Sequence, residues 1–136
     1  MPTEKVSVEW LGEREFRLQD RDGYAIRMAR PDGVNGADLL PLSLIGCAAW
    51  DVLAILVKQR QEVRSFSVEA SSQRDDEAPW RFRRILITYR IAGRKLQEPS
   101  IRRAFALTEA KYCSVFATLK DAVELTSAFE LTETGG

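Results

Sequence analysis

Histidine is absent from the 136 residues of the chain. This absence excludes a Ser-His-Asp triad, a histidine-ligated zinc site and a proton shuttle built on imidazole. Cysteine occurs only twice, at Cys47 and Cys113, so one chain holds too few soft ligands for a metal centre, although a dimer would bring four thiolates together. We expect no cofactor and no metal. Any chemistry must use thiol, carboxylate, guanidinium, amine or hydroxyl groups.

An excess of either charge is also lacking, because 20 Lys and Arg balance 20 Asp and Glu. Such a chain has no global field to attract nucleic acid or an anionic membrane, and neither common glycine-rich phosphate loop occurs. The first residues, MPTEKVSVEW, lack the cationic start and apolar core of a signal peptide. We therefore expect a cytoplasmic protein with free or transiently oxidised thiols and with neither a nucleic-acid nor a membrane partner.

Apolar and polar residues alternate in KVSVEW, EFRLQ and YAIRMA, which predicts three short antiparallel strands. Residues 39–57 then form a nearly continuous apolar run, but Pro41, Gly46 and Asp51 argue against a membrane span. A helix that is apolar almost all round must be buried almost all round. A chain of this size covers only part of it, so we expect a second subunit to cover the rest. Asp38 is the predicted N-cap.

Two longer alternating runs, SFSVEASSQR and WRFRRILITYRIAG, predict a hairpin after this helix. A second helix is expected over residues 98–126, with Pro99 suited to its first turn, and SAFELTE is expected to form the last strand. The predicted order is βββ-α-ββ-α-β in one domain over residues 1–136. Antiparallel strands set against helices indicate an α+β fold.

The segments around the two predicted helices read NGADLLPLSLIGCAAWDVLAIL and LTEAKYCSVFATLKDAVELTSAFEL. These sequences resemble the OsmC/Ohr family of osmotically inducible and organic-hydroperoxide-resistance proteins, and GC…DV followed by KYCSV resembles its OsmC-like subgroup. RQEV and DDEAPWRF fit as well, so the resemblance covers almost the whole chain. It implies an intertwined homodimer around two long helices and the thiol-dependent reduction of organic hydroperoxides.

The resemblance also implies roles for the two thiols. Cys47 would attack the peroxide as the peroxidatic cysteine, releasing an alcohol and becoming a sulfenic acid. Cys113 would resolve that acid to a disulfide, which a dithiol reductant, lipoyl groups in the better-understood members, would reduce. The residues alone leave a different interpretation open, because free cysteine is among the most buried residue types and both thiols sit among apolar neighbours.

A reactive Cys47 needs a nearby positive charge, because it lies about two turns beyond the predicted N-cap, where the helix dipole has faded, and because Asp51 at i+4 is negatively charged. The resemblance implies an arginine from the N-terminal strands. Arg14 is nearest to that position, with Arg27 and Arg30 as alternatives, and a solvated surface arginine is the other interpretation for each.

The family's helix-start glutamate, which holds this arginine, corresponds to Ala37 here. Asp38 lies one residue later, either as a replacement for that glutamate or as a plain N-cap. Trp50 and Phe116 belong to the core, to a dimer contact or to the wall of a pocket that admits alkyl or lipid hydroperoxides. Glu109 is the i−4 neighbour of the second cysteine and either hydrogen-bonds in the site or faces water.

Three functions follow from these residues. The first is a peroxidase with a Cys47–Cys113 cycle. The second is a non-catalytic dimer that binds a small apolar or thiol-bearing ligand, an alternative that the missing glutamate keeps open. The third is a structural dimer with inert thiols. Reactivity of Cys47 separates the first from the other two.

Overall fold

The computed structural model describes residues 1–135 and confirms the predicted α+β class. The chain forms two compact units, Met1–Leu40 and the part from Pro41 onward. The elements, in order, are β1 (Ser7–Gly12), β2 (Glu15–Gln19), β3 (Ala25–Ala29), the 3-10 helix η1 (Gly36–Asp38), α1 (Leu39–Lys58), β4 (Glu62–Arg74), β5 (Phe82–Arg94), α2 (Glu98–Leu107), the π-helix η2 (Thr108–Tyr112), α3 (Ser114–Leu119) and β6 (Glu124–Glu133).

The first unit is a three-stranded antiparallel sheet in the order β1-β2-β3, as the alternating pattern predicts. Arg27 on β3 pairs with Glu15 on β2, with 2.6 Å between Nε and Oε1, and it also donates to the carbonyl oxygen of Asp32. Asn35, not Asp38, provides the side-chain cap here, since its Oδ1 accepts from the N–H of Ala37 at 3.0 Å. The N-cap prediction was therefore placed three residues too late, because the chain makes a 3-10 turn before α1 begins.

Helix α1 buries one face and exposes the other. Leu44, Ala48, Val52 and Leu56 recur every four residues and are fully buried in the core of the second unit. Large apolar residues on the exposed side are Leu42, Trp50, Leu53 and Val57. By length and hydropathy the segment from Gly36 to Lys58 would suffice to cross a membrane, a test that core helices of soluble proteins also pass. The exposed face is the one that we expect a second subunit to cover.

Helix α1 ends in a turn that normally contains glycine. The N–H of Gln61 donates to the carbonyl of Leu56, and the N–H of Arg60 donates to that of Val57, both at 3.0 Å. This pair of bonds is a Schellman motif, and it places Arg60 in the left-handed region at φ 58°. An L-residue pays a steric cost in this conformation.

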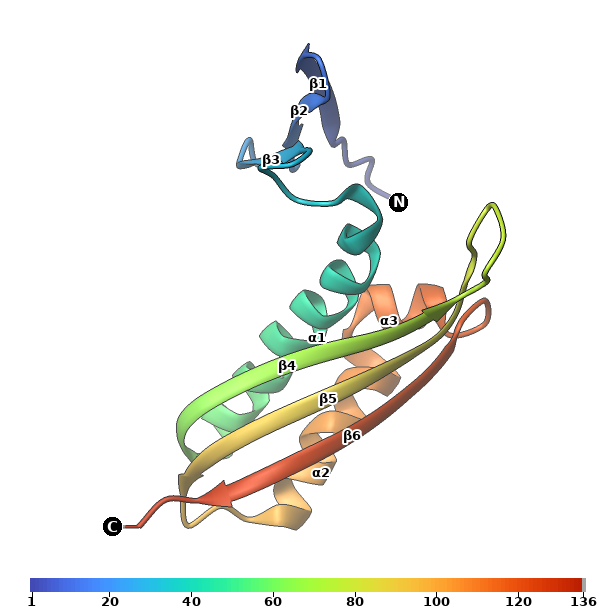
Figure 1. Ribbon diagram of the computed structural model, residues 1–136. Coiled ribbons are helices and arrows are strands. Elements are labelled where there is room, and N and C mark those ends of the chain that lie inside the picture. Colours follow the sequence, from blue (N-terminus) through green and yellow to red (C-terminus); the bar gives the residue numbers. More distant parts are fainter. Residues whose placement is uncertain (136) are drawn as a thin grey trace. The chain divides into compact units, whose positions relative to one another are not determined.

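The second unit is a three-stranded sheet with helices on one face only (Figure 1). The strand order is β4-β5-β6, and the central strand β5 buries every second side chain against the helices. These fully buried side chains include Ile85, Ile87 and Tyr89. The opposite face is polar, where Arg90 on β5 joins Glu69 on β4 at 2.8 Å and Glu130 on β6 at 3.0 Å.

Two details of this unit differ from the prediction. Strand β6 pairs with β5 in parallel, not antiparallel, because the intervening helices carry the chain back to the end where β5 starts. The helix expected over residues 98–126 is divided into α2, η2 and α3 and is finished by Leu119, and β6 then begins at Glu124. The division falls at Cys113, whose backbone is extended at φ −80° and ψ 104°.

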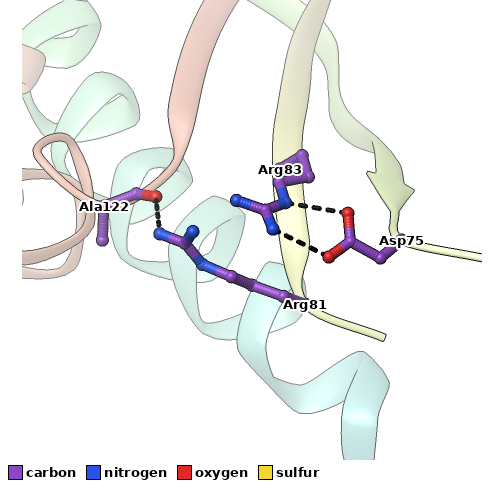
Figure 2. Close-up of polar contacts among 4 residues, drawn as sticks. All are labelled: Asp75, Arg81, Arg83 and Ala122. Carbon is purple, nitrogen blue, oxygen red and sulfur yellow. Dashed lines mark hydrogen bonds and ion pairs between the residues drawn. The ribbon is translucent and has the colours of Figure 1, made fainter. Parts of the chain in front are cut away.

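The β4–β5 connection is held by two arginines near the start of β5. Arg83 donates from Nε and Nη2 to the two carboxylate oxygens of Asp75, each at 2.8 Å, while Arg81 donates to the carbonyl of Ala122 at 3.0 Å (Figure 2). The neighbouring guanidinium of Arg83 lowers the pKa of the Asp75 carboxyl, chiefly through this hydrogen bonding. The contacts join the hairpin to the turn that leads into β6.

Candidate functional site

Cys47 lies on α1, between the buried positions Leu44 and Ala48. Its side chain is half-buried and packs against the core, and its thiol is free. The Sγ atom lies 4.0 Å from the hydroxyl oxygen of Ser114, the first residue of α3. A thiol in this position touches both the core and the start of the last helix.

Cys113 occupies the break between η2 and α3. Its backbone N–H donates to the carbonyl of Thr108 at 2.8 Å, which closes the π-helix, and its extended backbone then lets α3 start in a new direction. Its Sγ accepts the N–H of Phe116 at 3.4 Å, so the sulfur caps α3. The residue is only 2% exposed, and its Sγ lies 4.0 Å from the carbonyl oxygen of Leu44 on α1.

The two cysteines are neighbours although 66 positions separate them in the sequence, and both are free thiols. Burial raises the pKa of the Cys113 thiol to about 11; the Phe116 N–H opposes this shift, and the Cys47 thiol adds to it through hydrogen bonding and charge. Disulfide chemistry requires two cysteines to be near each other, and this pair is. In the reduced protein at neutral pH, Cys113 is a protonated thiol.

Trp50 and Phe116 occupy different surroundings. Trp50 lies on the exposed face of α1 and is 81% exposed, whereas Phe116 is half-buried and packs against the core beside Cys113. The sequence left the core, a dimer contact and the wall of a substrate pocket open for both. Phe116 is next to the thiols, and the role of Trp50 stays a prediction that depends on what covers the exposed face of α1.

The predicted arginine and carboxylate partners belong to the first unit. Arg14 and Arg30 line a pocket of about 430 Å³ whose other walls include Phe16, Met28 and Val34. Arg27 is engaged instead with Glu15 and with the Asp32 carbonyl, which leaves Arg14 and Arg30 as the stronger candidates.

Asp38 ends η1 and is exposed. The pairing of any of these arginines with Asp38 or Cys47 stays a prediction.

A buried polar group next to the thiols was not foreseen from the sequence. Tyr89 is fully buried, and its hydroxyl has no hydrogen-bond partner among residues 1–135. Its strand alternates normally, so the sequence pattern contains no sign that Tyr89 differs from other core residues. Glu109, four residues before Cys113, is half-buried, and its Oε1 also has no partner in this part of the chain. For Glu109, the i−4 spacing to the cysteine was the available signal.

Comparisons with known proteins agree on the type of chain. The model of a family described as "OsmC-like protein" matches residues 29–128. Protein YhfA of Escherichia coli K12 is 34% identical over 130 residues, which span 93% of this chain and 97% of YhfA. A hypothetical protein from Aquifex aeolicus VF5 is similar in structure, with a TM-score of 0.88, 30% identity and coverage of 99% of this chain and 100% of that one.

The fold is also that of the organic hydroperoxide resistance protein OhrB of Bacillus subtilis. The TM-score to OhrB is 0.60, at 16% identity, over 94% of this chain and 98% of OhrB. At this level of identity the likeness concerns the fold alone.

Proposed function

Because the chain belongs to the OsmC-like protein family, we propose that it is a thiol-dependent peroxidase that reduces organic hydroperoxides. One observation carries the proposal: the half-exposed Cys47 on α1 lies beside the buried Cys113, which precedes α3. The half-exposed thiol of Cys47 meets the substrate. The buried thiol of Cys113 is kept from the peroxide and meets only its partner.

The proposed cycle has three steps. The Cys47 thiolate attacks the peroxide oxygen that is remote from the alkyl group, the O–O bond breaks, and the alkoxide leaves as an alcohol after taking a proton. Cys113 then attacks the sulfenic sulfur, the S–OH bond breaks, and water leaves as the Cys47–Cys113 disulfide forms. A dithiol reductant of the lipoyl class returns both sulfurs to thiols by exchange.

Substrate class and assembly are parts of the same proposal. The apolar residues around the thiols favour an alkyl or lipid hydroperoxide over hydrogen peroxide. A homodimer is supported by the exposed apolar face of α1, and Arg14 and Asp38 are assigned to activating Cys47 within it. A cytoplasmic location is assigned because a reducing compartment keeps such a thiol pair free.

The test uses fully reduced protein and one equivalent of cumene hydroperoxide, followed by intact mass and a free-thiol count. We expect rapid loss of both thiols as an intrachain disulfide. Cys47→Ser should keep its remaining thiol, and Cys113→Ser should accumulate a sulfenic acid that dimedone traps. Equal rates with hydrogen peroxide and cumene hydroperoxide would contradict the substrate class. Thiols that persist in the wild-type protein would exclude the peroxidase.

The alternative function, binding without turnover, is favoured by the apolar pocket of about 430 Å³ in the first unit. Its occupant would be a small apolar or thiol-bearing ligand. Native mass spectrometry of the freshly purified protein distinguishes this case, because a ligand held by the pocket would remain bound while both thiols stay unreactive to cumene hydroperoxide.

A further inference from the structure

The proton on Cys113 has no direct way to solvent. The side chain is 2% exposed and its pKa is raised to about 11, so at pH 7 only about one molecule in 10,000 carries the thiolate. The thiolate is the form that attacks another sulfur. Rapid disulfide formation therefore requires a proton acceptor within the protein fold.

Two buried groups beside Cys113 have unused hydrogen-bonding capacity. The Tyr89 hydroxyl on β5 and the Oε1 of Glu109 on η2 are both buried without a partner among residues 1–135. Burial, together with the charges of Glu109 and Cys113, raises the pKa of Tyr89, so both groups lie close to this hydroxyl. A buried polar atom without a partner is rare and marks a place where water or chemistry completes the site.

Tyr89 and Glu109 line one pocket of about 230 Å³, together with Ser127 and Ala128 of β6. This volume has room for several water molecules at about 30 Å³ each. Burial raises the pKa of the Glu109 carboxyl above its ordinary value, and the nearby Ser127 hydroxyl acts in the opposite direction. The pocket therefore gives water access to the Tyr89 hydroxyl and the Glu109 carboxyl, between the helical segment and β6.

One charged group shares this pocket, and it is engaged elsewhere. Arg102 of α2 lies over the ring of Phe129, with its guanidinium carbon 4.6 Å from the ring centre, and it pairs with Glu98 at 3.6 Å. Within the part of the chain that the structure describes, no ion pair joins Arg102 to Glu109. The Glu109 carboxylate therefore keeps its capacity to accept a proton.

We propose that Glu109, acting through the Tyr89 hydroxyl and water in their shared pocket, receives the proton that Cys113 loses as it bonds to the sulfur of Cys47. For turnover of peroxide this inference rests on the proposed function. As the S–S bond forms, the S–H bond of Cys113 breaks and its proton moves by way of Tyr89 to Glu109, while the hydroxide that leaves the sulfenic acid takes a proton from solvent and becomes water. Glu109 then returns the proton to solvent. Glu109 and Tyr89 affect the reaction only through the Cys113 thiol, and in this sense they are positioning residues.

The test measures the attack of Cys113 without any peroxide. Ellman's disulfide reagent reacts first at the more exposed Cys47 and releases one nitrothiobenzoate anion, which absorbs at 412 nm. Cys113 then attacks the mixed disulfide, expels a second nitrothiobenzoate, and gives its proton to Glu109. The two phases are recorded by stopped flow from pH 5 to pH 11. The variants are Glu109→Gln and Tyr89→Phe, with Glu124→Gln as the matched control, because Glu124 is exposed and pairs with Arg84 outside this pocket.

We expect the first phase to be alike in all four proteins. The second phase should be slowed about 100-fold at pH 7 by Glu109→Gln and by Tyr89→Phe, in the range of general-base catalysis, and unchanged by Glu124→Gln. In the wild type its rate should level off once Glu109 is ionised. In Glu109→Gln only the thiolate attacks, so the rate should rise about tenfold per pH unit, and two such rises bring it level with the wild type near pH 9. A merely structural effect would not change this profile.

Three results would overturn the inference. They are a second phase of equal rate in the wild type and Glu109→Gln at pH 7, a wild-type second phase that follows thiolate alone over the whole pH range, and a wild-type protein that never releases the second anion. Tyr89→Phe provides an independent variant, since it deletes one buried oxygen and keeps the ring in the core. If the protein gives the expected second phase but does not react with cumene hydroperoxide, the proposed proton path holds and the proposed peroxidase function is excluded.

Discussion

The raised pKa of Cys113 gives a prediction that needs neither substrate nor partner. In the Cys47→Ser variant Cys113 is the only thiol, and its ionisation appears as thiolate absorbance at 240 nm. Burial is the largest cause of the shift from 9.0 to about 11, and it remains in this variant. We therefore expect a midpoint well above 9 in the folded protein and an ordinary midpoint in urea.

The same shift sets a dependence of stability on pH. The unfolded thiol ionises near pH 9, whereas the folded one keeps its proton to about pH 11. The unfolded state therefore holds fewer protons between these values, and the free energy of unfolding falls as the pH rises through this window. A two-unit shift corresponds to roughly 1–3 kcal/mol, where the lower figure allows for screening by solvent.

Tyr89 contributes in the same direction at high pH, because its pKa is also raised. The measurement is therefore a difference between urea unfolding curves of Cys47→Ser and of Cys47→Ser/Cys113→Ala at pH 8 and pH 11. We expect the stability lost between the two pH values to be larger in the protein that keeps Cys113. An equal loss in both, or a folded midpoint at 9 or below, would refute the argument from burial.

Other predictions concern the backbone and the exposed helix face. Arg60→Gly should raise the free energy of unfolding by about 0.5–1 kcal/mol, because it relieves the left-handed conformation at the end of α1; an unchanged or lower urea midpoint would contradict this. Gly93→Ala should lower the free energy of unfolding by about 1–3 kcal/mol, since a Cβ there would collide with the carbonyl of Glu62. An unchanged melting temperature would contradict this, because it would show that β4 and β5 move apart at no cost. Trp50→Glu should weaken the proposed homodimer about 100-fold, from the roughly 3 kcal/mol of a buried tryptophan, and light scattering that finds a monomeric wild-type protein would remove the basis for this expectation.

Most of the fold could be predicted from local sequence patterns. Strand alternation predicted both sheets, and the apolar run over residues 39–57 predicted α1, because period and composition are properties of the chain itself. The break at Cys113 had no such signal. After Pro99 the segment contains no proline or glycine until Gly135, and the apolar spacing continues across the break. The π-helix bond from Cys113 to Thr108 is made in the folded protein and leaves no trace in the local pattern.

The site was predictable to a smaller extent. Nothing in the spacing of Cys47 and Cys113 brings two positions 66 residues apart together; only the resemblance to a family did so. The strand pattern does not distinguish Tyr89 from other buried residues, because its unpartnered hydroxyl is a property of the tertiary packing. Glu109 was noticed through its i−4 spacing, but its half-buried position depends on how η2 meets β6. The roles of Arg14 and Asp38 stay predictions, because these residues and the thiols belong to different units.

The sulfur that caps α3 turns one backbone amide into a spectroscopic reporter. The Phe116 N–H donates to the Cys113 Sγ at 3.4 Å, and this bond begins a helix of only six residues. Any bond that the sulfur forms changes the electron density that this N–H meets. The amide chemical shift and hydrogen exchange of Phe116 would therefore distinguish thiol, thiolate and disulfide in a ¹⁵N-labelled sample, without a chemical label on either cysteine.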